Sequence, residues 1–286
     1  MPPVGCEWQI FPVSGNLGNL SSVFLDSNLI GMPSVRQPSD RASTGGGERL
    51  QNVLARRGVA SRRRVAEWIA AGRVTVSGKP VLEPGWRVTP GVDEIRLDGR
   101  LLAACAEMPR TLLMYKPCGV ICSADSSQGQ TVCDLVRHLA ERLVPVGRLD
   151  KDSEGLILLS NDGALIQRLT HPSLGHAKRY EVTVTGHLTE DALQLLRARQ
   201  ELDGYLTRPA QVQVLRRGRT THTLEFTLYE GRHHQVRRLC GRAGLTVTRL
   251  LRTAVAGLTL AGLRPGEWRE LTPAEQVRLQ ADAAES

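Results

Sequence analysis

The sequence contains few aromatic residues and no long apolar run. Phe, Trp and Tyr make up 4% of the 286 residues. No stretch approaches the roughly 20 consecutive apolar residues that a membrane-spanning helix needs. The N-terminus also lacks a basic region followed by an apolar segment, which is the pattern of a secretory signal. These absences exclude integral membrane and secreted proteins, so we expect a cytoplasmic protein.

Paired cysteine motifs are also missing. No Cys-x-x-Cys pair occurs among the six cysteines, which are Cys6, Cys105, Cys118, Cys122, Cys133 and Cys240. No His or Cys pair elsewhere has zinc-finger spacing. His233 and His234 are adjacent, and the side chains of adjacent helical residues diverge, which argues against a metal site. We therefore expect reduced thiols and no bound metal.

Acidic residues are fewer than basic ones. Lys and Arg number 37 against 29 Asp and Glu, which gives a net charge of +8. Two stretches concentrate the excess: residues 49–64 contain six Arg and no acid, and residues 230–252 contain six Arg and one Glu. Such clusters are more typical of a protein that binds an extended polyanion than of one that binds a small acidic metabolite.

Residues 1–47 differ in composition from the rest of the chain. They contain five Pro, seven Gly and no Lys, and they end in Thr-Gly-Gly-Gly. No helical or strand periodicity persists, so we expect a disordered tail and linker. Met32 is an alternative start of translation, and mass spectrometry of the native N-terminus would distinguish the two starts.

Residues 48–107 have the pattern of a small α/β domain. Apolar residues at i, i+3 and i+4 predict two short helices. We expect the first to end at Gly58, and the second to be capped by Ser61 and to end at Gly72. Alternating residues then predict a hairpin over 74–82 and short strands near 86–88 and 94–97.

Residues 108–286 mix strands and helices without strict alternation. We therefore expect an α+β fold with a mixed, mainly antiparallel sheet. Thr272, Pro273 and Glu275 form a capping box that predicts a C-terminal helix. The remaining expected elements are strands at 112–115, 155–159, 180–185, 212–215 and 223–229, and helices at 131–140, 163–169, 189–198 and 232–243.

Three motifs in the second region resemble those of a known family. They are Lys-Pro-Cys-Gly at 116–119, Gly-Arg-Leu-Asp at 147–150 with the apolar run and Asn-Asp-Gly that follow to 163, and Glu-Gly-Arg-His-His-Gln-Val-Arg-Arg at 230–238. Together they resemble the rRNA pseudouridine synthases. The run from 49 to 78 resembles the ribosomal-protein-S-four-like RNA-binding domain that precedes the catalytic domain in those enzymes.

This resemblance implies a reaction and the residues that perform it. The family detaches uracil from its ribose, rotates the base and rejoins it through carbon 5. By resemblance, Asp150 is the catalytic carboxylate, Tyr180 supplies a ring for the target base, and Arg237 is the cation beside Asp150. Attack on the anomeric carbon and removal of a ribose proton both remain open for Asp150. The redox-neutral reaction implies no cofactor.

The resemblance also implies a partner. We expect a monomer that binds rRNA or a pre-ribosomal particle, with large-subunit (23S) rRNA as the target. Small-subunit (16S) rRNA, tRNA and a non-catalytic RNA-binding role are the alternatives. Residues 48–107 contain 11 Lys and Arg against 7 acidic residues, so they should contribute much of the binding to RNA phosphates. The expected RNA-binding residues are Arg49, Arg57, Ser61, Arg62, Arg63, Arg73, Lys116, Arg148 and Arg238.

Overall fold

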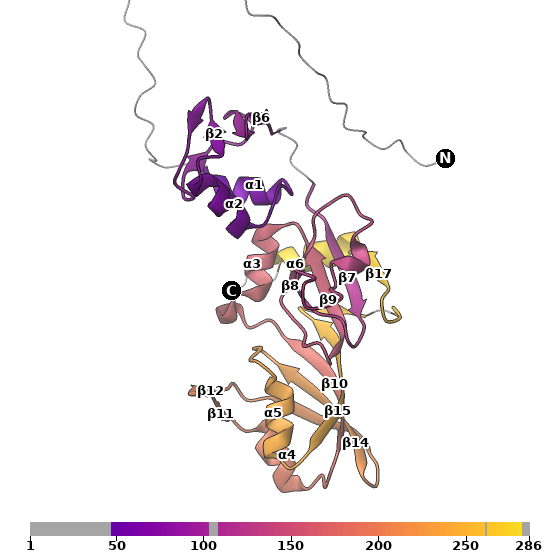
Figure 1. Cartoon of the computed structure of the whole chain (residues 1–286). Coiled ribbons are helices and arrows are strands. Elements are labelled where there is room, and N and C mark those ends of the chain that lie inside the picture. The colour runs from indigo at the N-terminus through magenta and orange to yellow at the C-terminus, as the bar shows by residue number, and fades with distance from the viewer. Residues whose placement is uncertain (1–46, 103–107, 261, 282–286) are drawn as a thin grey trace, which may run out of the picture. The chain divides into compact units, whose positions relative to one another are not determined.

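The computed structural model describes residues 47–102, 108–260 and 262–281 (Figure 1). The tail expected over 1–47 lies outside these residues, apart from Gly47. The division of the chain at 47 and 107 therefore stays a prediction.

The first described region contains the two expected helices. Helix α1 (Leu50–Arg56) buries its apolar stripe, and Gly58 follows it with φ of 69°. Helix α2 (Arg62–Ala70) begins where the Ser61 hydroxyl accepts a hydrogen bond from the Arg64 N–H at 3.2 Å. The short strands here are β1 (Glu48–Arg49), β2 (Val74–Val76), β3 (Lys79–Pro80), β4 (Arg87–Val88), β5 (Ile95–Leu97) and β6 (Arg100–Leu101).

The second region is built on one large mixed sheet, so the expected α+β class is confirmed. Its order is β13-β14-β10-β15-β9-β7-β17, with β16 beside β15 and β8 beside β9. These strands are β7 (Thr111–Lys116), β8 (Val144–Val146), β9 (Glu154–Ser160), β10 (Lys178–Thr185), β13 (Gln211–Arg217), β14 (Thr221–Leu228), β15 (Thr246–Val255), β16 (Leu258–Thr259) and β17 (Trp268–Glu270).

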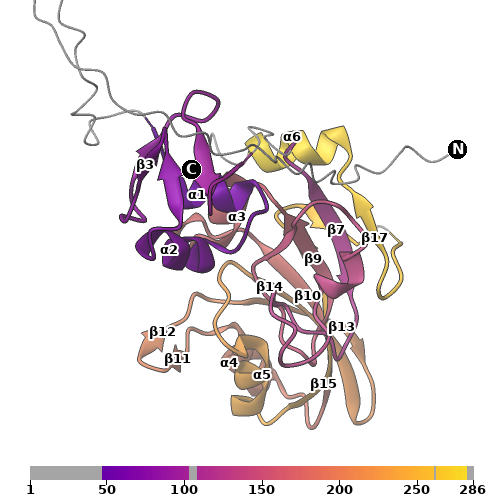
Figure 2. The same cartoon turned by 45° about the horizontal axis from the view of Figure 1, so that its top comes forward.

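Side chains of alternate residues divide between the two faces of this sheet. On β7, Leu112 and Met114 join one core cluster and Leu113 joins another. Helices α4 (Glu190–Arg197) and α5 (Gln235–Arg242) contact each other and pack on the first face (Figure 2). Helix α3 (Gly163–Thr170) contacts β8 and β9 on the second face.

Strands β9 and β15 join the two halves of the sheet as a parallel pair. Leu251 is aligned with Glu154, and Arg252 with Gly155. Gly155 has φ of 109°, and a Cβ there would lie 2.7 Å from the Arg252 nitrogen and still closer to its carbonyl oxygen. The position therefore requires glycine, because the two backbones approach too closely for any side chain.

One expectation about local structure was wrong, and one central strand was missed. The helix expected at 131–140 is only a 3₁₀ turn over Asp134–Val136, because i→i+3 bonds such as Leu139 N–H to Val136 O at 3.0 Å replace the α-helical pattern. Strand β15 was not predicted, since its first four residues, Thr-Val-Thr-Arg, include no buried residue. A second 3₁₀ turn spans Pro172–Leu174, and β11 (Glu201–Leu202) pairs with β12 (Tyr205–Leu206).

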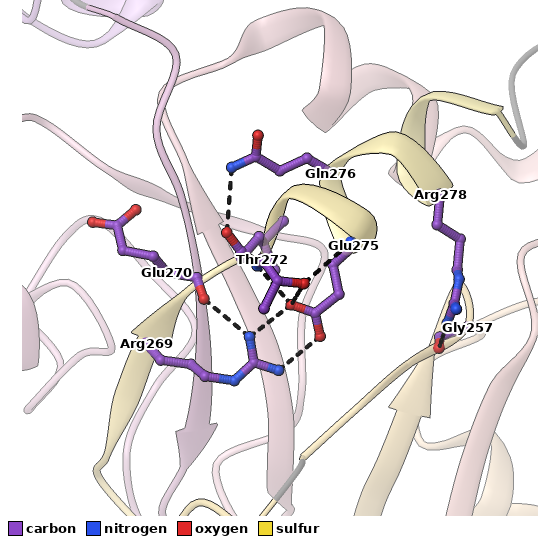
Figure 3. A network of polar contacts seen from close by, with 8 residues as sticks. Gly257, Arg269, Glu270, Thr272, Glu275, Gln276 and Arg278 are labelled. Atoms are coloured by element: carbon purple, nitrogen blue, oxygen red, sulfur yellow. Dashed lines mark hydrogen bonds and ion pairs between the residues drawn. The ribbon is translucent and has the colours of Figure 1, made fainter.

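The C-terminal capping box is formed as predicted (Figure 3). Helix α6 (Pro273–Ala281) begins where the Glu275 carboxylate accepts hydrogen bonds from the Thr272 N–H at 2.9 Å and from Arg269 at 2.7 Å. The Arg269 hydrogen bond is the main cause that lowers the pKa of Glu275 to about 2. This network fixes the helix against β17.

Candidate functional site

Asp150 lies in the loop that connects β8 to β9. The loop turns at Gly147, whose φ is 74°, and is anchored by the buried Leu149 side chain. The Asp150 carbonyl accepts the Ser153 N–H at 3.1 Å, which closes a tight turn. The Asp150 carboxylate remains 34% exposed. The loop therefore presents the carboxylate to a ligand while its backbone is held in place.

Lys116 holds this loop from inside the protein. Its side chain is fully buried, and its ammonium donates hydrogen bonds to the carbonyls of Ser153 at 2.6 Å, Pro117 at 2.9 Å and Lys151 at 3.3 Å. Burial lowers the pKa of Lys116, although Cys122 and Asp150 nearby oppose the shift. The expected contact between Lys116 and RNA phosphate is therefore wrong, because the ammonium does not reach solvent.

Tyr180 and Asp150 line the same cleft. This cleft has a volume of about 400 Å³ and is bounded by the Asp150 loop, residues 169–178, and residues 228–236, which include the first turn of α5. Tyr180 is 8% exposed on β10. Five Arg or Lys residues line the cleft against two acids, namely Arg148, Lys178, Arg208, Arg232 and Arg252 against Asp150 and Glu230. The site therefore suits a flat group attached to an anion.

Arg237 does not form the expected ion pair with Asp150. Its guanidinium donates to the carbonyls of Asp152 at 2.9 Å and of Val247 at 3.4 Å. Within the described residues, the basic atom in ion-pair range of the Asp150 carboxylate is Nε2 of His234, at 3.6 Å. Arg237 thus contacts the backbone of the Asp150 loop, whereas the His234 ring faces the carboxylate itself.

His234 has an unusual backbone conformation. It precedes α5 with φ of 52° and ψ of 27°, a left-handed conformation that few residues other than glycine adopt. Its ring stacks on that of His233, with centroids 3.9 Å apart. Sequence reasoning weighed these histidines only as metal ligands. Positive φ cannot be deduced from a His-His pair, so the proximity to Asp150 was missed.

A polar network fixes the turn that contains the histidines. The Gln235 amide donates to Glu230 at 2.7 Å, and the Arg232 N–H donates to the Gln235 amide oxygen at 3.0 Å. The Arg232 guanidinium lies 3.4 Å from the centroid of the Tyr205 ring, and the Tyr205 hydroxyl donates to Glu230 at 3.0 Å. The cleft wall is therefore pre-organised by contacts within residues 230–235 and between these residues and Tyr205.

Arg252 is a functional candidate that sequence reasoning did not select. It is 4% exposed on β15, and it is aligned with Tyr180 on the neighbouring strand. Its guanidinium donates to the carbonyls of Leu156 at 2.7 Å and of Arg148 at 3.4 Å. Among the described residues no carboxylate lies within 4.0 Å of it. The available signal was the position of Arg252 directly after the apolar residues Leu250 and Leu251, which indicates a charged side chain in a buried strand.

Lys178 adds a second partly buried cation to the cleft. Burial is the main cause that lowers its pKa, and the Arg252 charge lowers it further. Its ammonium donates to the His176 carbonyl at 3.1 Å. Two cations that share one wall repel each other, so a bound anion such as phosphate would stabilise both.

The other expected RNA-binding residues divide into exposed and engaged groups. Arg49, Arg62 and Arg63 are exposed, and Arg148 lines the cleft. Arg73 donates to Asp98 at 2.9 Å, and Arg238 forms two 2.7 Å contacts with Asp203, so both guanidinium groups already have acidic partners.

Arg57 and Ser61 are engaged as well. Arg57 is partly buried, with its pKa lowered mainly by burial and then by Arg56. The Ser61 hydroxyl caps α2. The cap uses the hydroxyl as an acceptor and leaves its proton available to a phosphate, so the assignment of Ser61 to RNA stays a prediction.

Four cysteines in the described residues are free thiols, whereas Cys6 and Cys105 lie outside them. Burial raises the pKa of Cys133 to about 11 and of Cys240 to about 12, so both thiols are protonated at neutral pH. Across 47–102, 108–260 and 262–281, no helix is long and apolar enough to span a membrane. Over the same residues, no group of three or more His, Cys, Asp or Glu side chains is arranged to hold a metal ion.

Comparisons with known proteins find relatives of both described regions. Residues 48–93 match the S4 domain and residues 110–241 match the RNA pseudouridylate synthase family. The chain is 41% identical to ribosomal large subunit pseudouridine synthase B of Bacillus subtilis over 82% of this chain and 96% of that one. It is 33% identical to the dual-specificity RNA pseudouridine synthase RluF of Escherichia coli, over 81% and 78%.

A solved structure described as a pseudouridylate synthase is 28% identical, has a TM-score of 0.57, and matches 81% of this chain and 99% of its own. The two domain matches and these relatives identify an RNA-modifying enzyme. The chain belongs to the RNA pseudouridine synthase family.

Proposed function

We propose that this enzyme isomerises one uridine of large-subunit rRNA to pseudouridine, with Asp150 as the catalytic carboxylate. The relative from Bacillus subtilis is named for the large subunit, and the S4 domain supports RNA as the partner. The observation on which the proposal depends is that Asp150 and Tyr180 line one cleft whose other charged residues are mainly basic.

Asp150 acts on the ribose of a uridine that has left its stack. A base inside an RNA helix is out of reach of a protein carboxylate, so the nucleotide must rotate outward. The carboxylate is partly exposed on a rigid loop, which allows contact with the sugar without a large rearrangement. Either attack on the anomeric carbon or removal of a ribose proton fits this placement.

Tyr180 and the buried cations complete the site. The Tyr180 ring gives the extruded base a flat surface, and stacking on an aromatic ring stabilises a base by about 1–3 kcal/mol. Arg252 and Lys178 offer positive charge to the phosphate of the same nucleotide. Together these groups would orient the freed uracil so that carbon 5 can rejoin the sugar.

Two basic residues assist Asp150 in different ways. Arg237 holds the loop through the Asp152 carbonyl, so it is a positioning residue in the free enzyme. His234 faces the carboxylate and, when protonated, would favour its charged form. Closure on RNA can bring Arg237 to the carboxylate as well, since catalytic contacts often tighten only in the complex.

The S4 domain contributes affinity for RNA that depends little on the RNA sequence. Its exposed Arg49, Arg62 and Arg63 can contact phosphates, which position an RNA without reading its bases. We propose that a single copy of the chain acts in the cytoplasm. A dual-specificity relative makes a second RNA target, such as small-subunit rRNA or tRNA, a testable alternative.

The proposal is tested by supplying the full chain with separate transcripts of 23S rRNA, 16S rRNA and a tRNA mixture. Pseudouridines are then mapped by chemical modification. We expect one new site in the 23S transcript and none in the others. Modification of only the 16S or tRNA substrate would overturn the target, and binding without modification of any RNA would favour a non-catalytic role.

A further inference from the structure

The hairpin formed by β13 and β14 ends in a basic tip. Arg216 and Arg217 end β13, and Arg219 lies in the turn before Thr221. All three arginines are exposed. Glu190 pairs with Arg217 at 3.1 Å, whereas Arg216 and Arg219 have no carboxylate within 4.0 Å among the described residues. The tip therefore presents two guanidinium groups whose hydrogen-bonding capacity is unused.

The backbone of this tip is well defined. The Gly218 N–H donates to the Thr221 carbonyl at 3.1 Å, and a Cβ on Gly218 would collide with that oxygen. The Gly186 N–H donates to the Thr220 carbonyl at 3.1 Å, which ties the turn to the neighbouring loop. A register shift between Val214 and Arg216 marks a bulge in β13. The arginines are thus displayed on a fixed support.

Protection of a sheet edge is an alternative explanation for these arginines. Strand β13 is at the edge of the sheet, and charged side chains on edge strands prevent pairing with other chains. Arg219, however, lies in the turn and not in the edge strand. Edge protection therefore does not explain the full cluster, whereas binding of an anion does.

The tip is remote from the cleft. Leu228 at the other end of β14 lines the cleft, and β14 is eight residues long. At about 3.4 Å per residue, the tip lies roughly 24 Å from the catalytic end of the strand. An RNA duplex is more compact along its axis than B-DNA, which rises about 3.4 Å per base pair, so this length spans more than about seven base pairs of RNA helix. A ligand that touches both places must therefore be an extended polyanion.

We propose that the β13–β14 tip is a second contact site for the phosphate backbone of the RNA substrate. This inference rests on the proposed function, because RNA held in the cleft is the polyanion available at high local concentration. Guanidinium groups match phosphate oxygens through two parallel hydrogen bonds. Arg216 and Arg219 bind phosphates beyond the target nucleotide, and they add affinity without touching the reacting atoms.

The test compares two double variants on two RNAs. Arg216→Gln with Arg219→Gln removes the two free charges of the tip. Arg264→Gln with Arg278→Gln removes two exposed charges outside both basic clusters and serves as the matched control. The short RNA holds the target loop closed by about three base pairs, and the long RNA extends that stem beyond about ten, which exceeds the span to the tip.

On the long RNA we expect the tip variant to bind roughly tenfold more weakly at 0.1 M salt. Its slope of log affinity against log salt should fall by about 1.4–1.8, the value for two lost phosphate contacts. On the short RNA it should bind like the unaltered enzyme, and its rate constant with saturating RNA should be unchanged on both. The control variant should match the unaltered enzyme throughout.

An unchanged salt slope on the long RNA would overturn the proposal, as would equal losses on both RNAs or in the control variant. Aggregation of the tip variant with normal RNA binding would favour edge protection instead. Failure of the proposed function gives a different result, because the unaltered enzyme would then make no pseudouridine in either RNA although its binding could still be measured.

Discussion

Replacement of Gly155 by alanine should separate the two halves of the catalytic sheet. The new Cβ would lie 2.7 Å from the Arg252 nitrogen and nearer still to its carbonyl oxygen. Alanine is also strained at φ of 109°, which costs about 1–3 kcal/mol. The backbones would move apart to relieve the collision, which would weaken one or two hydrogen bonds of the β9–β15 pair and cost about 1 kcal/mol for each. The total loss of unfolding free energy is about 2–5 kcal/mol.

Equilibrium unfolding in urea measures this loss. With a slope of about 2 kcal/mol per molar urea, the midpoint should fall by about 1–2.5 M. Gly163→Ala is the matched control, because Gly163 begins α3 in the same motif and a Cβ there meets nothing within 4 Å. Its stability should change by less than about 1 kcal/mol, with a gain favoured because alanine restricts the unfolded chain.

Activity should follow the same geometry. The Asp150 loop leads directly into β9, and β15 carries Arg252, so a change in their spacing displaces the two sides of the cleft. Gly155→Ala should therefore lose at least about tenfold in single-turnover rate under conditions where it is folded. A loss of stability below about 1 kcal/mol, or equal losses in both glycine variants, would refute the close-approach argument.

Further predictions concern the groups around the cleft and the capping box. Lys116→Met should lower the stability of the fold by about 2 kcal/mol, because it leaves the carbonyls that bind the ammonium without donors. It should also slow the reaction. Thermal unfolding and single-turnover assays measure the two effects, and an unaltered rate would contradict the anchoring role. His234→Asn keeps a residue that tolerates the left-handed backbone but removes the ring that faces Asp150. We expect a single-turnover rate about fivefold slower, measured by rapid quench, and an RNA affinity within about twofold, measured by filter binding. A selective loss of RNA affinity would count against a role beside the carboxylate. The depressed pKa of Glu275, from 4.5 to about 2, stabilises the fold fully above pH 4.5 and is lost as the pH falls towards 2. Glu275→Gln should therefore lose about 1–2 kcal/mol of unfolding free energy at pH 7 after allowance for solvent screening. Urea titrations should show that the difference in stability between this variant and the unaltered chain shrinks below pH 4.5. A constant difference at all pH values would contradict this.

Periodicity and capping signals were sufficient to predict most elements of the fold. The stripes that define α1 and α2, the alternation in β10 and β14, and the Thr272 capping box depend on neighbours within a few residues. The 3₁₀ turn at Asp134–Val136 was mistaken for a helix because buried residues recur at similar intervals in both structures. Strand β15 has mixed polarity, so its central place becomes evident only from its partners.

The candidate site could be predicted only in part. Motif resemblance selected Asp150 and Tyr180, which line one cleft. It also placed Lys116 at the cleft surface, since the sequence does not reveal that three carbonyls surround a buried ammonium. The direction of the Arg237 side chain and the proximity of His234 to Asp150 depend on a backbone torsion and on distant loops. Such long-range geometry leaves no local pattern.

The most direct test of the account is tritium release from rRNA labelled at carbon 5 of uridine, measured for two variants of one loop. Asp150→Asn keeps the shape of the side chain and removes its charge, and Asp152→Asn makes the same change at an exposed neighbour. We expect Asp150→Asn to bind RNA normally and release no tritium, and Asp152→Asn to retain activity. Tritium release by Asp150→Asn at the unaltered rate would contradict the assignment of the catalytic carboxylate.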